Sequence, residues 1–206
     1  MHPKLWLIHI PKTAGGSIKA AFGGQPGWHL SLTETLERFE EPHDRVLFAV
    51  TRNPYERSIS MWNYTMSISD RTGNNHRRTA RMLISSFSSD PSSFWIRIQD
   101  IDALSKTLPI FRRQTDILDD PVLGQRVSLL RFEHLQEDLN QLCAVVGIDP
   151  IMLPNRRFHS LPEEQKAKSL SKEARERIRY HYEGDFPLWE RISNAGPLII
   201  ADSCVR

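Results

Sequence analysis

The chain has 206 residues, of which 39% are hydrophobic and 25% are charged. This composition excludes a disordered chain, and the length suits one domain over residues 1–206 rather than two. The formal net charge of +2 is too small to indicate nucleic-acid binding by itself, so any anion site has to be local.

The N-terminal segment predicts a strand, a loop and a helix in succession. Residues 5–10 form a short apolar run that ends at Pro11, as expected of a buried strand. Residues 12–16 form a small loop with two glycines, and residues 17–22 continue with helical spacing of apolar side chains. A strand that feeds a glycine-containing loop and a helix is a common setting for anion binding.

A second strand and helix follow the same plan. Residues 46–51 (VLFAVT) are a continuous apolar run, which is typical of a strand buried on both faces. Asn53 is a good N-cap and Pro54 a good first residue for the helix that follows.

The rest of the chain continues the alternation of strands and helices. The predicted elements are a loop or exposed helix at 70–81, a short helix at 94–98, a strand at 127–131, a helix over 135–146 that ends at Gly147, and a charged helix from Ser171 to about Tyr182. This order predicts a three-layer α/β domain with a mainly parallel central sheet.

The cysteines and the N-terminus indicate no disulfide framework, metal site or membrane anchor. Cys143 lies among apolar residues and is predicted to be a core residue, and Cys204 lies near the C-terminus. Neither cysteine has metal-ligand spacing around it. Residues 1–10 lack a cleavage-site pattern and are far too short to span a membrane, so the expected location is cytoplasmic.

The first motif is the segment HIPKTAGGS, from His9 to Ser17. Its glycines let backbone N–H groups approach an anion, the start of a helix adds partial positive charge, and Lys12 supplies a full charge. It is not a Walker A loop, because the lysine precedes the glycines instead of following them. The alternative interpretation is an ordinary turn between a strand and a helix.

The second motif is the segment TRNPYERSIS, from Thr51 to Ser60. Arg52 lies at the carboxyl end of a predicted strand, where α/β sheets bind ligands. Arg57 and Ser60 share a helical face, and an arginine with a hydroxyl there could hold a phosphate group. The alternative is a surface network in which the arginines pair with Glu56.

Together the two motifs resemble sulfotransferases that use 3'-phosphoadenosine 5'-phosphosulfate (PAPS). The closest likeness is to the carbohydrate branch that includes heparan sulfate 2-O-sulfotransferases and bacterial relatives. Three further segments support the resemblance: 112–116 (RRQTD, with Arg113 where the branch has proline), 131–135 (RFEHL) and 182–189 (YEGDFPLW).

The resemblance implies a P-loop-type fold that does not hydrolyse nucleoside triphosphates and needs no metal. Residues 11–17 would hold the 5'-phosphosulfate, namely Pro11, Lys12, Thr13, Ala14, Gly15, Gly16 and Ser17. Arg52 and Ser60 would hold the 3'-phosphate. Lys12 would also act in catalysis by stabilising the charge on the leaving oxygen.

The acceptor hydroxyl needs a general base, and the resemblance favours His29. In that branch a catalytic histidine precedes the 3'-phosphate strand by a similar distance, and His29 lies 23 residues before Arg52. The alternative is a partly buried histidine packed beside Trp28. His43 is a poorer candidate, because it should lie at the amino end of the 46–51 strand, and Glu34 is the nearest carboxylate substitute.

The acceptor itself is not named by the sequence. A cluster of four arginines in 71–81 (Arg71, Arg77, Arg78 and Arg81) could recruit an anionic glycan, or could be a solvated surface. A late loop at 155–160 (NRRFHS) could cover the cofactor. A non-catalytic nucleotide-binding module and a nucleotide kinase-like phosphotransferase are the alternative functions.

Overall fold

The computed structural model describes residues 2–24, 29–67, 75–119, 126–154 and 169–200. The chain divides into two compact units that interleave along the sequence. The first contains the described residues within 1–52, 113–156 and 187–206, and the second contains those within 53–112 and 157–186.

The first unit is built on a three-stranded parallel sheet. Its strands are β1 (Leu5–Leu7), β2 (Val46–Thr51) and β3 (Ser128–Arg131), in the order β1-β2-β3. Leu7 pairs with Phe48, and Thr51 pairs with Arg131. Because all three strands run the same way, their carboxyl ends meet at one edge of the sheet, where α/β proteins bind ligands.

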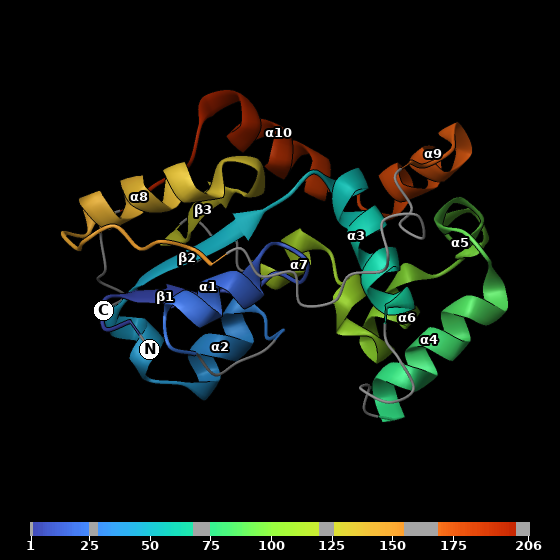
Figure 1. Cartoon of the computed structure of the whole chain (residues 1–206), viewed down its shortest axis with the longest axis horizontal. Helices are drawn as coiled ribbons and strands as arrows, with labels where there is room; N and C mark the ends of the chain where they lie inside the picture. The colour runs from blue at the N-terminus through green and yellow to red at the C-terminus, as the bar shows by residue number, and fades with distance from the viewer. Residues whose placement is uncertain (1, 25–28, 68–74, 120–125, 155–168, 201–206) are drawn as a thin grey trace. The chain divides into compact units, whose positions relative to one another are not determined.

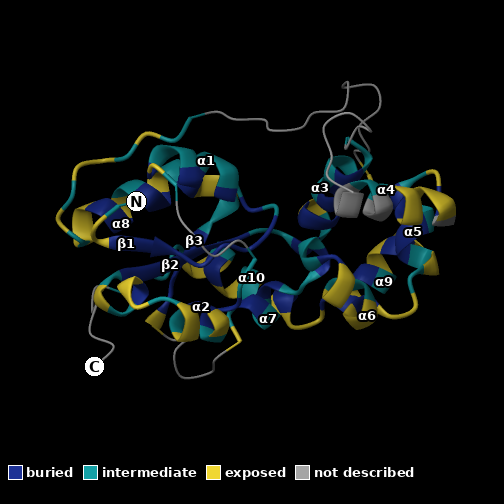
Figure 2. Ribbon diagram, turned by 90° about the horizontal axis from the view of Figure 1, so that it is seen from below, coloured by how far each residue is buried: buried dark blue, intermediate teal, exposed yellow. Residues whose placement is uncertain are grey.

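Helices cover both faces of this sheet, which makes the first unit layered (Figures 1 and 2). One face packs against α1 (Gly15–Ala21) and α8 (Leu135–Val145). The other packs against α2 (Leu32–Arg38), α7 (Gln114–Ile117) and α10 (Asp185–Ala195). Along β2, Phe48 and Val50 face the first layer, while Leu47 and Ala49 face the second. A strand buried on both faces requires such a continuous apolar run, and each fully buried large side chain contributes roughly 1.5–3 kcal/mol.

The second unit is helical and has an aromatic core. Its helices are α3 (Pro54–Met66), α4 (Asn75–Phe87), α5 (Pro91–Arg97), α6 (Ile101–Thr107) and α9 (Lys172–His181). Short 3₁₀ turns lie at η1 (Glu41–Asp44) and η4 (Phe132–His134) in the first unit and at η2 (Pro109–Phe111) in the second. The rings at the centre of the second unit belong to Trp62, Phe94, Trp95, Phe111 and Tyr182.

The α/β class and the parallel sheet predicted from the sequence are confirmed. Asn53 caps α3 as predicted, since its Oδ1 accepts hydrogen bonds from the backbone N–H groups of Tyr55 and Glu56. The first strand is shorter than the apolar run that predicted it. It ends at Leu7, although the chain stays buried as far as Ile10. Helix α1 begins at Gly15 rather than at residue 17, so both glycines lie in its first turn.

Among the described residues, the sequence analysis missed four helices, which are α2, α6, α7 and α10, and it left one segment ambiguous. Helix α2 begins with a capping box at its N-terminus. Helix α10 packs on the sheet and lies near the C-terminus of the chain. The described part of 70–81 is helical and belongs to α4. A single domain over 1–206 stays a prediction beside the division into two units. None of the helices in the described ranges is both long and apolar enough to cross a membrane.

Candidate functional site

The loop between β1 and α1 has a backbone shape that suits an anion. Lys12 and Ala14 adopt positive φ angles of 69° and 65°, and His29 has a φ of 61°. These are the non-glycine residues with positive φ in the described part of the chain. Each such conformation costs about 1–2 kcal/mol, and strained residues of this kind cluster at functional sites. Left-handed residues within a turn also point successive N–H groups into a concavity that binds anions.

Thr13 stabilises this loop from within. Its side chain is 1% exposed, and its hydroxyl donates a 2.7 Å hydrogen bond to the carbonyl oxygen of Ile10. The proton of this hydroxyl is therefore used inside the protein. The predicted contact of Thr13 with the 5'-phosphosulfate stays a prediction, and the observed hydrogen bond stabilises the turn that carries Lys12.

The cations of the two motifs meet at the carboxyl edge of the sheet. The guanidinium of Arg52 donates a 3.2 Å hydrogen bond to the carbonyl oxygen of Lys12, and it lies 4.0 Å from the centre of the Phe132 ring. Burial, with a further contribution from the charge of Arg52, lowers the pKa of Lys12 to about 8. Two positive side chains at the same edge of the sheet, close enough for one to lower the pKa of the other, favour the binding of a multiply charged anion.

Lys19 adds a third cation that the sequence analysis did not single out. It lies on α1, one helical turn after Gly15, and its side chain is only 6% exposed. Burial lowers its pKa to about 8 as well. A lysine at that position of an amphipathic helix has no sequence signature of its own, since long basic side chains are usual on helix surfaces.

His9 and His29 form a stacked pair beside the glycine loop. Their ring centres are 5.1 Å apart with 29° between the ring planes. His9 is 6% exposed, and burial, followed by the charges of His29, Lys19 and Lys12, holds its pKa well below the ordinary value. Burial therefore favours the neutral form of His9, whose ring stacks on His29 and also packs against Gly15.

The contact between His9 and Gly15 explains why residue 15 is a glycine. A Cβ atom added to Gly15 would lie 2.0 Å from Nε2 of His9, far inside van der Waals contact. We expect Gly15→Ala to destabilise the protein by about 1–3 kcal/mol, as overpacking of a buried site typically does. Urea unfolding would measure the change.

A second background makes this expectation specific. In a His9→Ala protein the obstructing ring is gone, so Gly15→Ala should be neutral there, or slightly stabilising because alanine favours helices. An equal loss of unfolding free energy in both backgrounds would show that the clash with His9 is not the cause.

The second motif is divided between the two units. Arg52 belongs to the first unit, whereas Ser60 lies half-buried on α3 in the second. The structure does not bring Arg57 to a ligand: its side chain is 1% exposed and lies 3.8 Å from the carboxylate of Asp185. It also donates a 2.7 Å hydrogen bond to the carbonyl oxygen of Arg112. This arginine is buried beside Asp185, so the alternative of a surface network with Glu56 does not describe Arg57.

The two substitutes considered for His29 have structural roles. The carboxylate of Glu34 accepts a 2.6 Å hydrogen bond from the backbone N–H of Ser31, and the Ser31 hydroxyl accepts one from the backbone N–H of Glu34. This reciprocal pair is the capping box of α2. His43 lies in η1, before the amino end of β2, and its Nε2 is 2.9 Å from the carbonyl oxygen of Leu36. Its predicted position away from the ligand edge is confirmed.

Some of the residues and segments singled out in the sequence lie outside the part of the chain that the structure describes. Arg71, Cys204 and the 155–160 loop fall outside the described residues. Arg78 and Arg81 are half-buried on α4, while nothing is described of the Arg77 side chain. Cys143 is fully buried in the core of the first unit, as predicted, and burial raises the pKa of its thiol.

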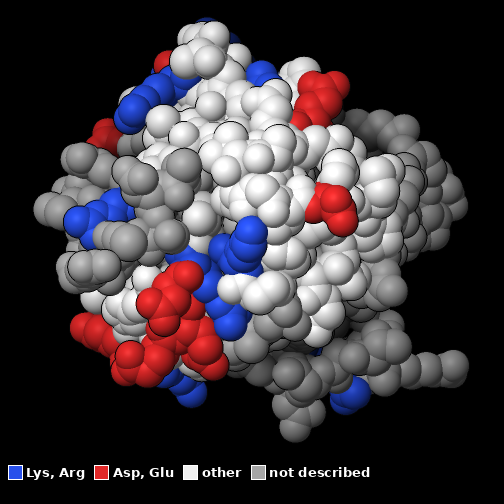
Figure 3. Space-filling model, turned by 90° about the vertical axis from the view of Figure 1, so that its left-hand side faces the viewer, with Lys and Arg blue, Asp and Glu red and all other residues white. Residues whose placement is uncertain are grey.

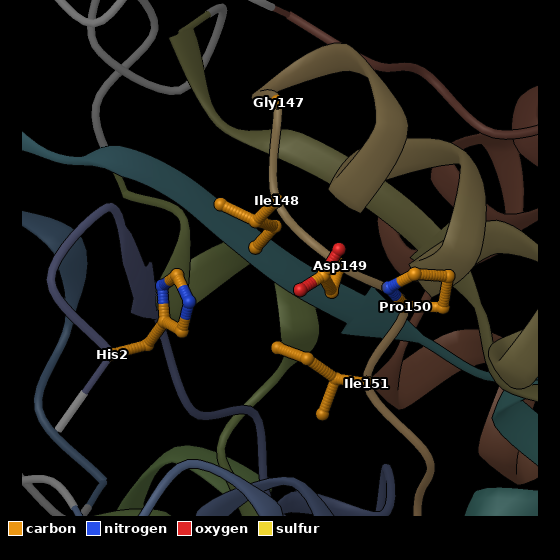
Figure 4. Close-up of a pocket in the computed structure, with 6 residues that line it drawn as sticks. All are labelled: His2, Gly147, Ile148, Asp149, Pro150 and Ile151. Carbon is orange, nitrogen blue, oxygen red and sulfur yellow. The ribbon is translucent and has the colours of Figure 1, made fainter.

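A cavity of about 590 Å³ lies elsewhere, near the amino ends of the strands. It is lined by His2 and by residues 147–151, which follow α8, and Figure 4 shows the imidazole of His2 and the carboxylate of Asp149 on its walls. This cavity contains none of the residues of either motif. The face in Figure 3 carries basic side chains in the middle with a group of acidic ones beside them, in keeping with a net charge near zero.

Comparison with known proteins gives no relative. No protein-family model, no curated protein and no solved structure matches this chain. What the site can do therefore follows from its geometry: a strained loop, three buried or half-buried cations and a stacked histidine pair lie at or beside the carboxyl edge of a parallel sheet.

Proposed function

We propose that this chain is a PAPS-dependent sulfotransferase with a P-loop-type fold, which transfers a sulfuryl group to an acceptor hydroxyl, on a carbohydrate or glycoconjugate. The observation that carries the proposal is the contact between Arg52 and Lys12. The sequence separates these residues by two helices and a strand, yet the guanidinium of one bonds the backbone of the other. A donor with phosphate groups at both ends needs two such cationic points at one edge.

The loop and its cations have separate roles in this proposal. The donor supplies a sulfuryl group on a phosphate leaving group. The N–H groups of the loop and the ammonium of Lys12 would bind the 5'-phosphosulfate, and Arg52 would bind the 3'-phosphate. As the acceptor oxygen bonds to sulfur, the bond between sulfur and the bridging oxygen breaks, and its electron pair stays on the phosphate. Lys12 would stabilise that growing negative charge.

The proton of the acceptor hydroxyl would pass to His29. Its stacked contact with His9 holds it beside the glycine loop. We expect His29→Ala to lower kcat about 10²–10⁴-fold, the usual effect of removing a general base, with little change in PAPS affinity. The wild-type kcat should rise with pH through one ionisation, and this limb should be absent from the variant. A variant that melts earlier but keeps its kcat and its pH limb would remove His29 from the mechanism.

Binding tests the proposal without knowledge of the acceptor. The product 3',5'-ADP should raise the melting temperature, whereas ATP with Mg²⁺ should not. We expect Arg52→Ala to weaken 3',5'-ADP by about 1.5–3 kcal/mol while leaving 5'-AMP, which lacks the 3'-phosphate, almost unchanged. Calorimetric titration of both nucleotides would measure this difference.

Arg45 offers a matched control for Arg52. It immediately precedes β2, as Arg52 immediately follows it, and its guanidinium lies 5.3 Å from the centre of the Trp6 ring. Arg45→Ala therefore removes a stacked arginine from the opposite end of the same strand, and it should leave both affinities unchanged. Equal weakening of 3',5'-ADP and 5'-AMP by Arg52→Ala would show that Arg52 does not bind the 3'-phosphate.

A further inference from the structure

We propose that Gln114 is a positioning residue that fixes Arg52 in the orientation needed to bind the 3'-phosphate. This inference rests on the proposed function and adds to it a residue with no charge and no direct contact with the donor.

The evidence is a two-point contact between the Gln114 side chain and the backbone of Arg52. The backbone N–H of Arg52 donates a 3.0 Å hydrogen bond to Oε1 of Gln114, and Nε2 of Gln114 donates a 3.0 Å hydrogen bond to the carbonyl oxygen of Arg52. The Gln114 side chain is fully buried at the first position of α7. A carboxamide has one acceptor and one donor group side by side, so it can pair with both polar groups of a single residue.

The position of Arg52 makes this contact useful. The parallel ladder between β2 and β3 ends at Thr51, which pairs with Arg131, so Arg52 is the first residue beyond it. Backbone polar groups at such a point need other partners, and Gln114 supplies them. The guanidinium is held separately, by the Phe132 ring and the carbonyl oxygen of Lys12. With backbone and head group both fixed, less side-chain entropy is lost when an anion binds.

Gln136 is a matched control, because it bonds backbone groups in the same way at a different place. Its Nε2 donates a 3.0 Å hydrogen bond to the carbonyl oxygen of Ile151, and its Oε1 accepts a 3.0 Å hydrogen bond from the backbone N–H of Leu153. It lies on α8 in the same unit. If Gln114 only satisfied buried polar groups, replacing either glutamine would have the same consequences.

The experiment compares Gln114→Met with Gln136→Met, since methionine keeps the length of the side chain but removes both hydrogen bonds. The ratio of the dissociation constants of 5'-AMP and 3',5'-ADP measures selectivity for the 3'-phosphate. We expect Gln114→Met to lower this ratio roughly tenfold, the effect of one well-made hydrogen bond, while Gln136→Met leaves it unchanged. Faster hydrogen exchange of the Arg52 amide, in Gln114→Met alone, would report the loosened backbone directly.

A second variant covers the case in which Gln114→Met does not fold. Gln114→Glu keeps the size of the side chain and an acceptor for the N–H of Arg52, but its ionised carboxylate cannot donate to the Arg52 carbonyl oxygen. It should also lower the selectivity ratio. A wild-type ratio in either folded Gln114 variant overturns the positioning role, as does an equal loss in Gln136→Met. A wild-type protein that binds 3',5'-ADP no better than 5'-AMP overturns the proposed function itself.

Discussion

Replacement of Lys12 by alanine is expected to lower the rate of sulfuryl transfer about 10²–10³-fold, because loss of one group that stabilises a developing negative charge has this effect in other enzymes. The fold should survive, since Lys12 is a half-buried loop residue and alanine removes its buried charge. Initial rates with radiolabelled PAPS and a screened acceptor would measure the change. Near-normal turnover would remove Lys12 from the mechanism.

Two controls separate this role from a general effect of charge. Lys4→Ala removes a lysine at the opposite edge of the sheet, where its ammonium bonds the carbonyl oxygens of Val146 and Gly147 at the end of α8. It should reduce stability slightly and leave the rate unchanged. Lys12→Arg keeps the charge but changes the shape of the group, so it should recover only part of the activity.

The pH dependence of donor binding provides an independent check on Lys12. Its pKa is lowered to about 8 in the free protein, so the ammonium is charged below that pH and loses its proton above it. Affinity for 3',5'-ADP should therefore fall as the pH rises through about 8, and the bound anion should raise the pKa and be accompanied by proton uptake. Calorimetry in buffers of different ionisation enthalpy would detect that uptake, and Lys12→Ala should reduce it.

The sequence predicted those elements whose burial produces a clear pattern of apolar residues. The run VLFAVT has no polar residue before Thr51, which is typical of a strand covered on both faces, and it is β2. Helix α2 was missed because the segment around it offers only Ser31 and Glu34 as signals, and that pair becomes a capping box only once the chain has turned. Helix α10 was overlooked because its residues were considered only as a motif.

The sequence indicated which residues belong to the candidate site but not how they contact one another. Lys12 and the glycines were singled out because these residue types in a strand-loop-helix segment favour phosphate binding. The stacking of His9 on His29 depends on the path of the chain between residues 9 and 29, which no spacing rule determines. Gln114 belongs to a segment noted for its resemblance alone, and its partner lies 62 residues away.

The sequence also did not predict that the two arginines of TRNPYERSIS have different surroundings. Arg57 is 1% exposed and Asp185 is 0% exposed, so both charges of this pair lie in the interior of the second unit. Asp185→Ala should destabilise the protein by roughly 3–5 kcal/mol, because it leaves a buried arginine without its counter-charge. Chemical denaturation, followed by the signal of the aromatic core, would measure this loss.

The Arg113–Asp116 pair is the control for Asp185→Ala, and the outcome decides what the second arginine is for. Its atoms are closer, at 3.3 Å, but Asp116 is 42% exposed, so Asp116→Ala should change stability by no more than about 1 kcal/mol.

Replacing both members of the buried pair, as Arg57→Met with Asp185→Leu, should restore much of the stability lost in Asp185→Ala, since no charge is then left unpaired. That double variant should also retain its selectivity for 3',5'-ADP over 5'-AMP, because Arg57 is not among the residues expected to hold the 3'-phosphate. A double variant that folds but has lost this selectivity would return Arg57 to the binding site, and a change below about 1 kcal/mol in Asp185→Ala would show that the buried pair is not a main source of stability.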